Sequence, residues 1–218
     1  MPTPNPVPPK TRMRLLLAAS RIFAEKGFQE TTIAEICEQA KTNIASVNYH
    51  FRDKESLYLE AWRHAFHNEL KTHPADGGVS AEASAELRLA GRIRSLLARI
   101  ADDKSYSFAI IHKEMAQPTR LLSEILAQEI EPQRRQMLAL IGECLGSGAS
   151  ERQLRFCHAS IIGQCFHLLQ MTHLQNHIPC AFKQSKHTDP DAFAEHVIAF
   201  SLAGIQALRV QIDKGPPC

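Results

Sequence analysis

The sequence predicts an all-α protein in two parts: an N-terminal three-helix helix-turn-helix domain and a C-terminal helical domain for regulation and dimerisation. Two observations predict this class. Apolar residues recur every three or four positions along most of the chain, and strand patterns are rare. The length of 218 residues also suffices for two helical domains with separate cores. The expected boundaries are a disordered proline-rich arm at 1–9, the helix-turn-helix at 10–56 and the larger domain at 57–218.

The first helix is expected from Thr11 to Lys26. Gly27 stands where a left-handed C-terminal cap belongs, and Phe28 follows to close the hydrophobic contact. The apolar positions of this helix form one stripe at helical spacing: Leu15, Ala18, Ala19, Ile22 and Phe23.

Two short helices and a tight turn follow. Thr32 and Glu35 form a capping box for a helix that ends near Ala40. Lys41 and Thr42 make the turn, and Asn43 is a suitable N-cap for a second helix that ends at Phe51.

The second short helix has the pattern of a helix that enters the DNA major groove. Val47 and Phe51, four residues apart, should face inward. Asp53 can cap the next helix, and Lys54 then lies at its first turn beside free N–H groups that suit a phosphate. The side chains left on the outer face and at the ends of the second helix are Asn43, Ile44, Ala45, Ser46, Asn48, Tyr49 and His50.

Residues 11–60 resemble the DNA-binding domain of the TetR family of bacterial transcriptional regulators. The resemblance lies in AASRIFAEKGFQETTIAEICEQA, in NYHF and in the KESL that begins at Lys54. It implies that Thr32 and Lys54 hold phosphates, that Tyr49 and His50 lie at the backbone or base edges, and that Asn43, Ile44, Ala45, Ser46 and Asn48 face the groove. Lys41 departs from the family, which often has Gly in this turn; a positive φ there would cost about 1 kcal/mol.

The charge composition favours DNA binding by one basic segment rather than by a protein that is basic throughout. The chain has 25 basic and 23 acidic residues and a formal net charge of +2. Basic residues are concentrated in the first helix and its lead-in, where only Glu25 opposes Lys10, Arg12, Arg14, Arg21 and Lys26.

The remainder is expected to be helical. A linking helix should run from Lys54 to about Leu70, and THPADGGVSA at 72–81 reads as a linker. Further helices are expected at 82–102, 105–117, 119–146, 150–176 and 189–213.

The last two long helices carry wide apolar faces that exceed the needs of one small domain. The resemblance implies that they pair with their copies in a homodimer, and a dimer would read both halves of a palindromic operator in double-stranded DNA. The alternative is that they fill their own core. The predicted interface residues are Ile161, Cys165, Leu168, Val197, Phe200 and Ile205.

The middle helices are expected to form a chamber for a small-molecule effector that releases a repressor from its operator. Residues 110–126 resemble the regulatory domain of the TetR subgroup named for CecR, through Lys113-Glu114 and Pro118-Thr119. The candidate polar groups of the chamber are Arg99, Tyr106, His112, Glu114, Gln117, His158, Gln164 and His167.

Other interpretations remain open. His167, His173 and His177 could hold a metal, but no further ligand is well spaced, so no metal site and no cofactor are predicted. A regulator without a ligand could instead contact a protein partner, and a helical thiol enzyme could use Cys157, His158 and Glu114. No secretory signal or membrane span is expected, which predicts a cytoplasmic protein.

Overall fold

The computed structural model describes residues 10–177 and 189–214, except for the side chains of 172–177. These residues form two compact units. The head consists of the chain up to Asn68 together with Lys104–Glu129, and the body consists of Glu69–Asp103 and the chain from Ile130 onward. The predicted arm at 1–9 and the side chains of His173 and His177 lie outside the described residues.

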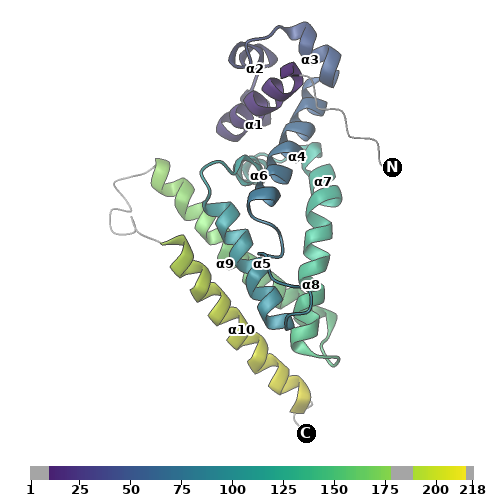
Figure 1. Cartoon of the computed structure of the whole chain (residues 1–218), viewed down its shortest axis with the longest axis vertical. Helices are drawn as coiled ribbons and strands as arrows, with labels where there is room; N and C mark the ends of the chain where they lie inside the picture. Colours follow the sequence, from purple (N-terminus) through teal and green to yellow (C-terminus); the bar gives the residue numbers. More distant parts are fainter. Residues whose placement is uncertain (1–9, 178–188, 215–218) are drawn as a thin grey trace. The chain divides into compact units, whose positions relative to one another are not determined.

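The helix-turn-helix occupies the first part of the head (Figure 1). Gly27 breaks the first helix with φ 81° and ψ 176°. The positive φ favours glycine, but this ψ differs from that of the predicted left-handed cap. The largest buried side chains here include Phe23, Phe51 and Tyr58. The helices are α1 (Lys10–Glu30), α2 (Ile33–Gln39), α3 (Ile44–Phe51) and α4 (Lys54–Thr72).

The head also contains α6 (Tyr106–Ala116), which packs against α1. Trp62 Nε1 donates to the carbonyl of Ser107 at 3.1 Å, and the Tyr58 hydroxyl donates to Glu114 at 2.7 Å. Both bonds are buried. The compact units therefore differ from the expected division at residue 56, because a segment distant in sequence completes the core of the head.

Glu114 is the centre of a hydrogen-bonded cluster in the head that also includes Tyr58 and Thr119. Its side chain is 2% exposed, and it accepts hydrogen bonds from the Tyr58 hydroxyl and from the Thr119 N–H at 2.8 Å. Burial, and then the bond to Glu114, raise the pKa of Tyr58 well above its ordinary value. Glu114 thus joins α4, α6 and the N-cap of α7 (Arg120–Ile125).

The expected single helix at 119–146 is interrupted. After α7 comes a π-helical turn, η1 (Leu126–Ile130), and then α8 (Glu131–Leu145). Pro132 lies at the start of α8. Proline lacks an N–H and its ring clashes with the carbonyl four residues earlier, so the α-helical register cannot continue through this point.

The body packs α5 (Ala85–Ala101) against α8, α9 (Glu151–His177) and α10 (Pro190–Lys214) (Figure 1). Leu89, Ile93 and Leu97 on α5 are fully buried. The bounds of α9 and α10 lie close to those predicted. By length and mean hydropathy alone, α10 could also cross a membrane; it contacts α5, α8 and α9, and core helices pass the same test.

The loop between α4 and α5 lies directly against α5 at two glycines. A Cβ on Gly77 would lie 2.3 Å from the carbonyl oxygen of Gly91, and a Cβ on Gly91 would lie 2.5 Å from that of Asp76. Gly77 also has a φ of 66°, which favours glycine. The close approach of this loop therefore requires both residues to lack a side chain.

Gly91→Ala is expected to lower the free energy of unfolding by about 1–3 kcal/mol, because the new methyl group must push the loop away. Gly142→Ala in α8 is the matched control. Its Cβ would meet Leu154 at an ordinary 3.5 Å, so helix propensity should stabilise this variant by about 0.5–1 kcal/mol. Urea unfolding followed by circular dichroism measures both, and equal stabilisation of the two variants would contradict the packing argument.

Candidate nucleic-acid interface

Two side-chain caps fix the ends of α2 and α3. The Thr32 hydroxyl accepts from the Glu35 N–H at 3.2 Å, and the Glu35 carboxylate accepts from the Thr32 N–H at 3.0 Å. The Asn43 side chain accepts from the Ser46 N–H at 3.0 Å. Both predicted caps are confirmed. Lys41 between the helices has a φ of 50°, so the turn keeps the backbone that glycine favours.

α3 has one buried face and one exposed face. Val47 and Phe51 are 1% and 2% exposed, whereas Ile44 and Tyr49 are 54% and 84% exposed. The inward-facing pair is therefore confirmed. Asn43, Ala45 and Asn48 are also exposed, whereas Ser46 and His50 are half-buried. The DNA contacts of these residues stay predictions.

Three of the predicted DNA-contacting groups also hold the local structure. The Ser46 hydroxyl donates to the Asn43 side chain at 3.0 Å and accepts from the Thr42 hydroxyl at 2.9 Å. The Thr32 hydroxyl lies 3.0 Å from the Glu35 carboxylate. A side chain of Thr32, Asn43 or Ser46 that contacted a phosphate or a base would do so while it also makes the local hydrogen bonds that cap the helices.

A tight turn connects α3 to α4. Arg52 has φ 72° and ψ −54°, and the Asp53 N–H donates to the Phe51 carbonyl at 2.9 Å, which is the geometry of a γ-turn. The Asp53 carboxylate then accepts from the Ser56 N–H at 2.7 Å, and this bond lowers the pKa of Asp53. The predicted cap is confirmed. The γ-turn was not predicted, because arginine carries no signal for a positive φ.

Lys54 lies over the edge of the first helix. Its Nζ is 4.5 Å from the ring centroid of Phe28 and donates to the Gln29 carbonyl at 3.5 Å. Partial burial lowers the pKa of Lys54. The ammonium group is thus held against the C-terminal end of α1, and its phosphate contact stays a prediction.

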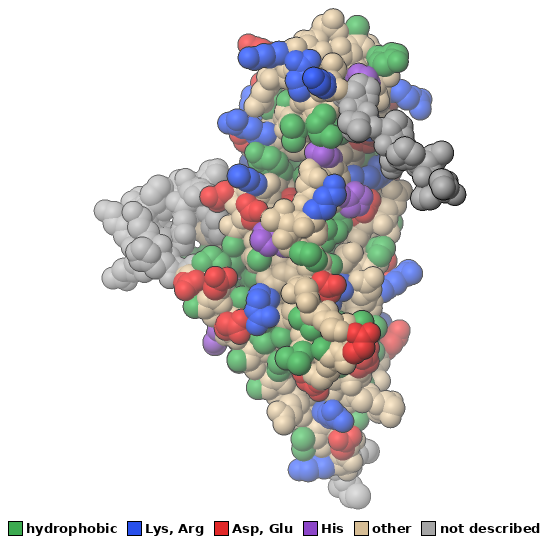
Figure 2. Space-filling view, in the orientation of Figure 1, with side chains coloured by type: hydrophobic (Ala, Val, Ile, Leu, Met, Phe, Trp, Pro, Cys, Tyr) green, Lys and Arg blue, Asp and Glu red, His purple; other side chains and the backbone are tan. Residues whose placement is uncertain are grey.

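Ion pairs within the head reduce the expected basic footprint. Arg12 pairs with Glu60, Arg21 with Glu25 at 2.8 Å and Lys26 with Glu35 at 2.5 Å. Lys26 is the main reason that the pKa of Glu35 is lowered to about 2. Figure 2 shows Lys and Arg side chains on the visible face of the head, interspersed with acidic ones. Lys10, Arg14 and Lys41 have no acidic partner among the residues that the structure describes.

The eight predicted ligand-binding residues do not belong to one compact unit. Four lie in the head (Tyr106, His112, Glu114, Gln117) and four in the body (Arg99, His158, Gln164, His167). Glu114 already accepts several hydrogen bonds, and His167 is exposed on α9. The candidate residues divide between the two units, so a single chamber stays a prediction. Sequence reasoning missed a cleft in the body that is lined by the loop after α4, α5 and α8.

Most of the predicted dimer residues are already buried within one chain. Ile161, Cys165, Leu168, Val197 and Ile205 are at most 5% exposed, whereas Phe200 is 64% exposed. The wide apolar faces of α9 and α10 pack mainly against the rest of the body, although Ile161 and Ile205 also line a surface groove. Phe156, 65% exposed, was missed; it lines a groove of about 220 Å³ with Phe200 and Gly204.

The thiol-enzyme interpretation finds no support in the site chemistry. Burial raises the pKa of Cys157, whereas nucleophilic cysteines have a lowered pKa. Among the residues that are described, no three His, Cys, Asp or Glu side chains are grouped to hold a metal ion.

Capped short helices with one exposed face define a helix-turn-helix protein with an all-helical C-terminal part. Residues 15–61 match the bacterial regulatory proteins of the tetR family, and residues 85–205 match the C-terminal domain of the HTH-type transcriptional dual regulator CecR. This chain belongs to the TetR family and has a CecR-type C-terminal domain. Both predicted resemblances are confirmed.

Individual relatives agree with this assignment. The chain is 31% identical to the HTH-type transcriptional repressor NicS of Pseudomonas putida over 63% of its own length, and spans 59% of that protein. It is 28% identical to CecR of Shigella flexneri over 71% of its length and 74% of CecR. The TetR-family regulator SCO4454 of Streptomyces coelicolor shares the fold, with a TM-score of 0.66, 18% identity and coverage of 94% and 92% of the two chains.

Proposed function

We propose that the protein is a cytoplasmic, DNA-binding transcriptional repressor that inserts α3 into the major groove of an operator. The observation that carries this proposal is the side chain of Tyr49, which is 84% exposed on a helix whose opposite face is buried. The Tyr49 ring contacts the edge of the neighbouring His50 ring, at 4.9 Å between centroids, and takes no part in the buried core of the head. Aromatic and polar side chains at this position can contact the sugar-phosphate backbone or base edges.

The active form would be a homodimer. Phe156 on α9 and Phe200 on α10 remain exposed although α9 and α10 pack within the body. Burial of two such rings against the same groove of a second copy would supply a two-fold interface. Two copies of α3 about 34 Å apart would then read the halves of a palindrome.

An effector bound to the body would lower operator affinity through α4. This helix is continuous, and its residues up to Asn68 belong to the head whereas those from Glu69 belong to the body. The transcriptional regulator FadR of Bacillus subtilis was solved with stearoyl-CoA and shares this fold, with a TM-score of 0.66, 17% identity and coverage of 88% and 98% of the two chains. That likeness supports a regulator with a ligand over one that responds only to a protein partner. The coupling free energy between effector and operator is limited by the difference in effector affinity between the DNA-binding state and the released state.

Tyr49→Ala is expected to weaken operator binding about tenfold or more, which corresponds to about 1.4 kcal/mol or more, because it removes a side chain placed to contact DNA. Mobility shift with DNA that flanks the gene measures the affinity. Leu87→Ala is the control, since it removes an exposed side chain from α5 of the body. Light scattering should show the same oligomeric state for both. Unchanged DNA affinity of Tyr49→Ala would refute the role assigned to α3.

A further inference from the structure

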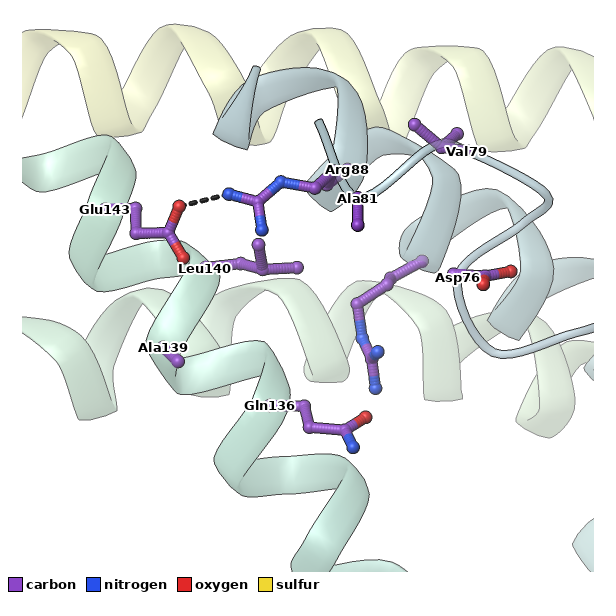
Figure 3. Close-up of a pocket in the computed structure, with 9 residues that line it drawn as sticks. Asp76, Val79, Ala81, Arg88, Gln136, Ala139, Leu140 and Glu143 are labelled. Atoms are coloured by element: carbon purple, nitrogen blue, oxygen red, sulfur yellow. Dashed lines mark hydrogen bonds and ion pairs between the residues drawn. The ribbon is translucent and has the colours of Figure 1, made fainter. Parts of the chain in front are cut away.

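The body contains a cleft of about 300 Å³ that the family assignment leaves without a role. One wall is the loop after α4, which contributes Asp76, Val79 and Ala81. The other sides are α5 and α8 (Figure 3). The helices line the cleft with Arg88, Arg92, Gln136, Ala139, Leu140 and Glu143.

The loop wall is held in place without a ligand. Gly77 and Gly91 meet with no room for a Cβ on either residue. The Asp76 carboxylate accepts from the Gly78 N–H at 2.9 Å, and in Figure 3 it points away from Arg88 and Leu140. The cleft is therefore pre-formed, and the Asp76 carboxylate of this wall does not point toward Arg88.

Arg92 is the unusual charge in this cleft. Its two hydrogen bonds within the described residues leave from Nη2 and reach the carbonyl and side-chain oxygens of Gln133 at 3.4 and 2.9 Å. Both partners are neutral. By contrast, Arg88 pairs with Glu143 and Arg94 pairs with Glu195, so its neighbours on α5 have carboxylate partners.

The surroundings make this charge costly. The Arg92 side chain is half-buried, and burial lowers the pKa of its guanidinium while the nearby charge of Asp76 opposes that shift. A partly desolvated cation gains most from an anionic partner. Nε and Nη1 of Arg92 make no hydrogen bond to any described residue, and they remain available to such a partner.

The shape and polarity of the cleft indicate the kind of anion. A guanidinium N–H that has no partner can donate a charge-assisted hydrogen bond to a carboxylate oxygen. Val79, Ala139 and Leu140 offer an apolar wall, and the volume suits a small molecule. Two cations, Arg88 and Arg92, and two carboxylates, Asp76 and Glu143, line the cleft, so a ligand with a second negative charge would be disfavoured.

We propose that this cleft binds a small monocarboxylate with an apolar body, held by the Arg92 guanidinium. The site gives a chemical class to the effector, and for that biological role it rests on the proposed function. The binding itself can be tested without DNA.

Isothermal titration of the full-length protein with benzoate and hexanoate, and with benzamide and hexanamide as neutral analogues, tests the class. The carboxylates should bind at least about tenfold more tightly than the amides, because only the acids can form a hydrogen-bonded charge pair with Arg92. Equal binding of acids and amides, or no binding of any probe at millimolar concentration, would overturn the proposal.

Arg92→Gln tests the residue. It should lower carboxylate affinity about tenfold or more, and Arg94→Gln on the same helix, outside the cleft, should not. If circular dichroism shows that Arg92→Gln is unfolded, Ala139→Phe is the second test of the site. Ala139 is exposed, so a phenylalanine there can fill the cleft without entering the core, and it should also lower carboxylate affinity. Retained affinity in either folded variant would refute the site.

Mobility shift separates this proposal from the proposed function. Carboxylate binding that weakens DNA affinity supports both. Carboxylate binding that leaves DNA affinity unchanged supports the site and removes its effector role. Carboxylate binding by a protein that shows no DNA binding at all would refute the regulator and leave the site intact.

Discussion

Phe200→Glu is expected to convert the protein to a monomer and to lower its operator affinity by about 100-fold, or about 2.7 kcal/mol. The Phe200 side chain is 64% exposed in one chain and lines the same groove as Phe156. In the proposed dimer, a glutamate there would have to bury its charge without a partner. A monomer would also lose the second α3, so only half of the palindrome would be bound.

Size-exclusion chromatography with light scattering measures the first effect, and mobility shift measures the second. Leu87→Glu is the matched control, because Leu87 is 59% exposed on α5 and should tolerate the charge. Ile161→Glu is a poor probe, since Ile161 is 2% exposed within one chain and the change would unfold the body. A dimeric Phe200→Glu protein, or a monomeric wild type, would contradict the proposed interface.

Glu114→Ala is expected to lower the free energy of unfolding by about 3 kcal/mol. The Tyr58 hydroxyl and the Thr119 N–H would both lose a charged acceptor, and each unsatisfied buried group costs about 1–3 kcal/mol. Glu114→Gln keeps one oxygen acceptor, so its loss should be smaller. Urea unfolding measures both variants.

Glu124→Ala provides the comparison on the neighbouring helix α7. Glu124 is exposed, so its removal should change stability by no more than about 0.5 kcal/mol. A double-mutant cycle with Tyr58→Phe should show strong coupling to Glu114→Ala, since the two groups share a bond. A loss below about 1 kcal/mol in Glu114→Ala would show that the buried group does not stabilise the head.

Local signals in the chain were enough to place the short helices of the head. The pairing of Thr32 with Glu35, and the cap at Asn43, act within three residues of sequence. Likewise the spacing of Val47 and Phe51 on one helix face depends on backbone geometry alone. For this reason the exposed face of α3 could be predicted before its surroundings were known.

The burial of the α9 and α10 faces could not be obtained in this way. An apolar stripe has the same pattern whether it packs within its own chain or against another copy, so Ile161 and Phe200 look alike in sequence. The break before α8 was missed for a related reason, since periodicity continued across Pro132.

The amino-acid order thus specified which segments are helical, where the short helices of the head begin and which family the chain resembles. Those properties follow from contacts between near neighbours in the chain. The grouping of α6 with the head and the cleft beside Arg92 depend on segments tens of residues apart, such as the loop after α4 and α8. Packing between distant elements selects such partners, and no local pattern encodes it.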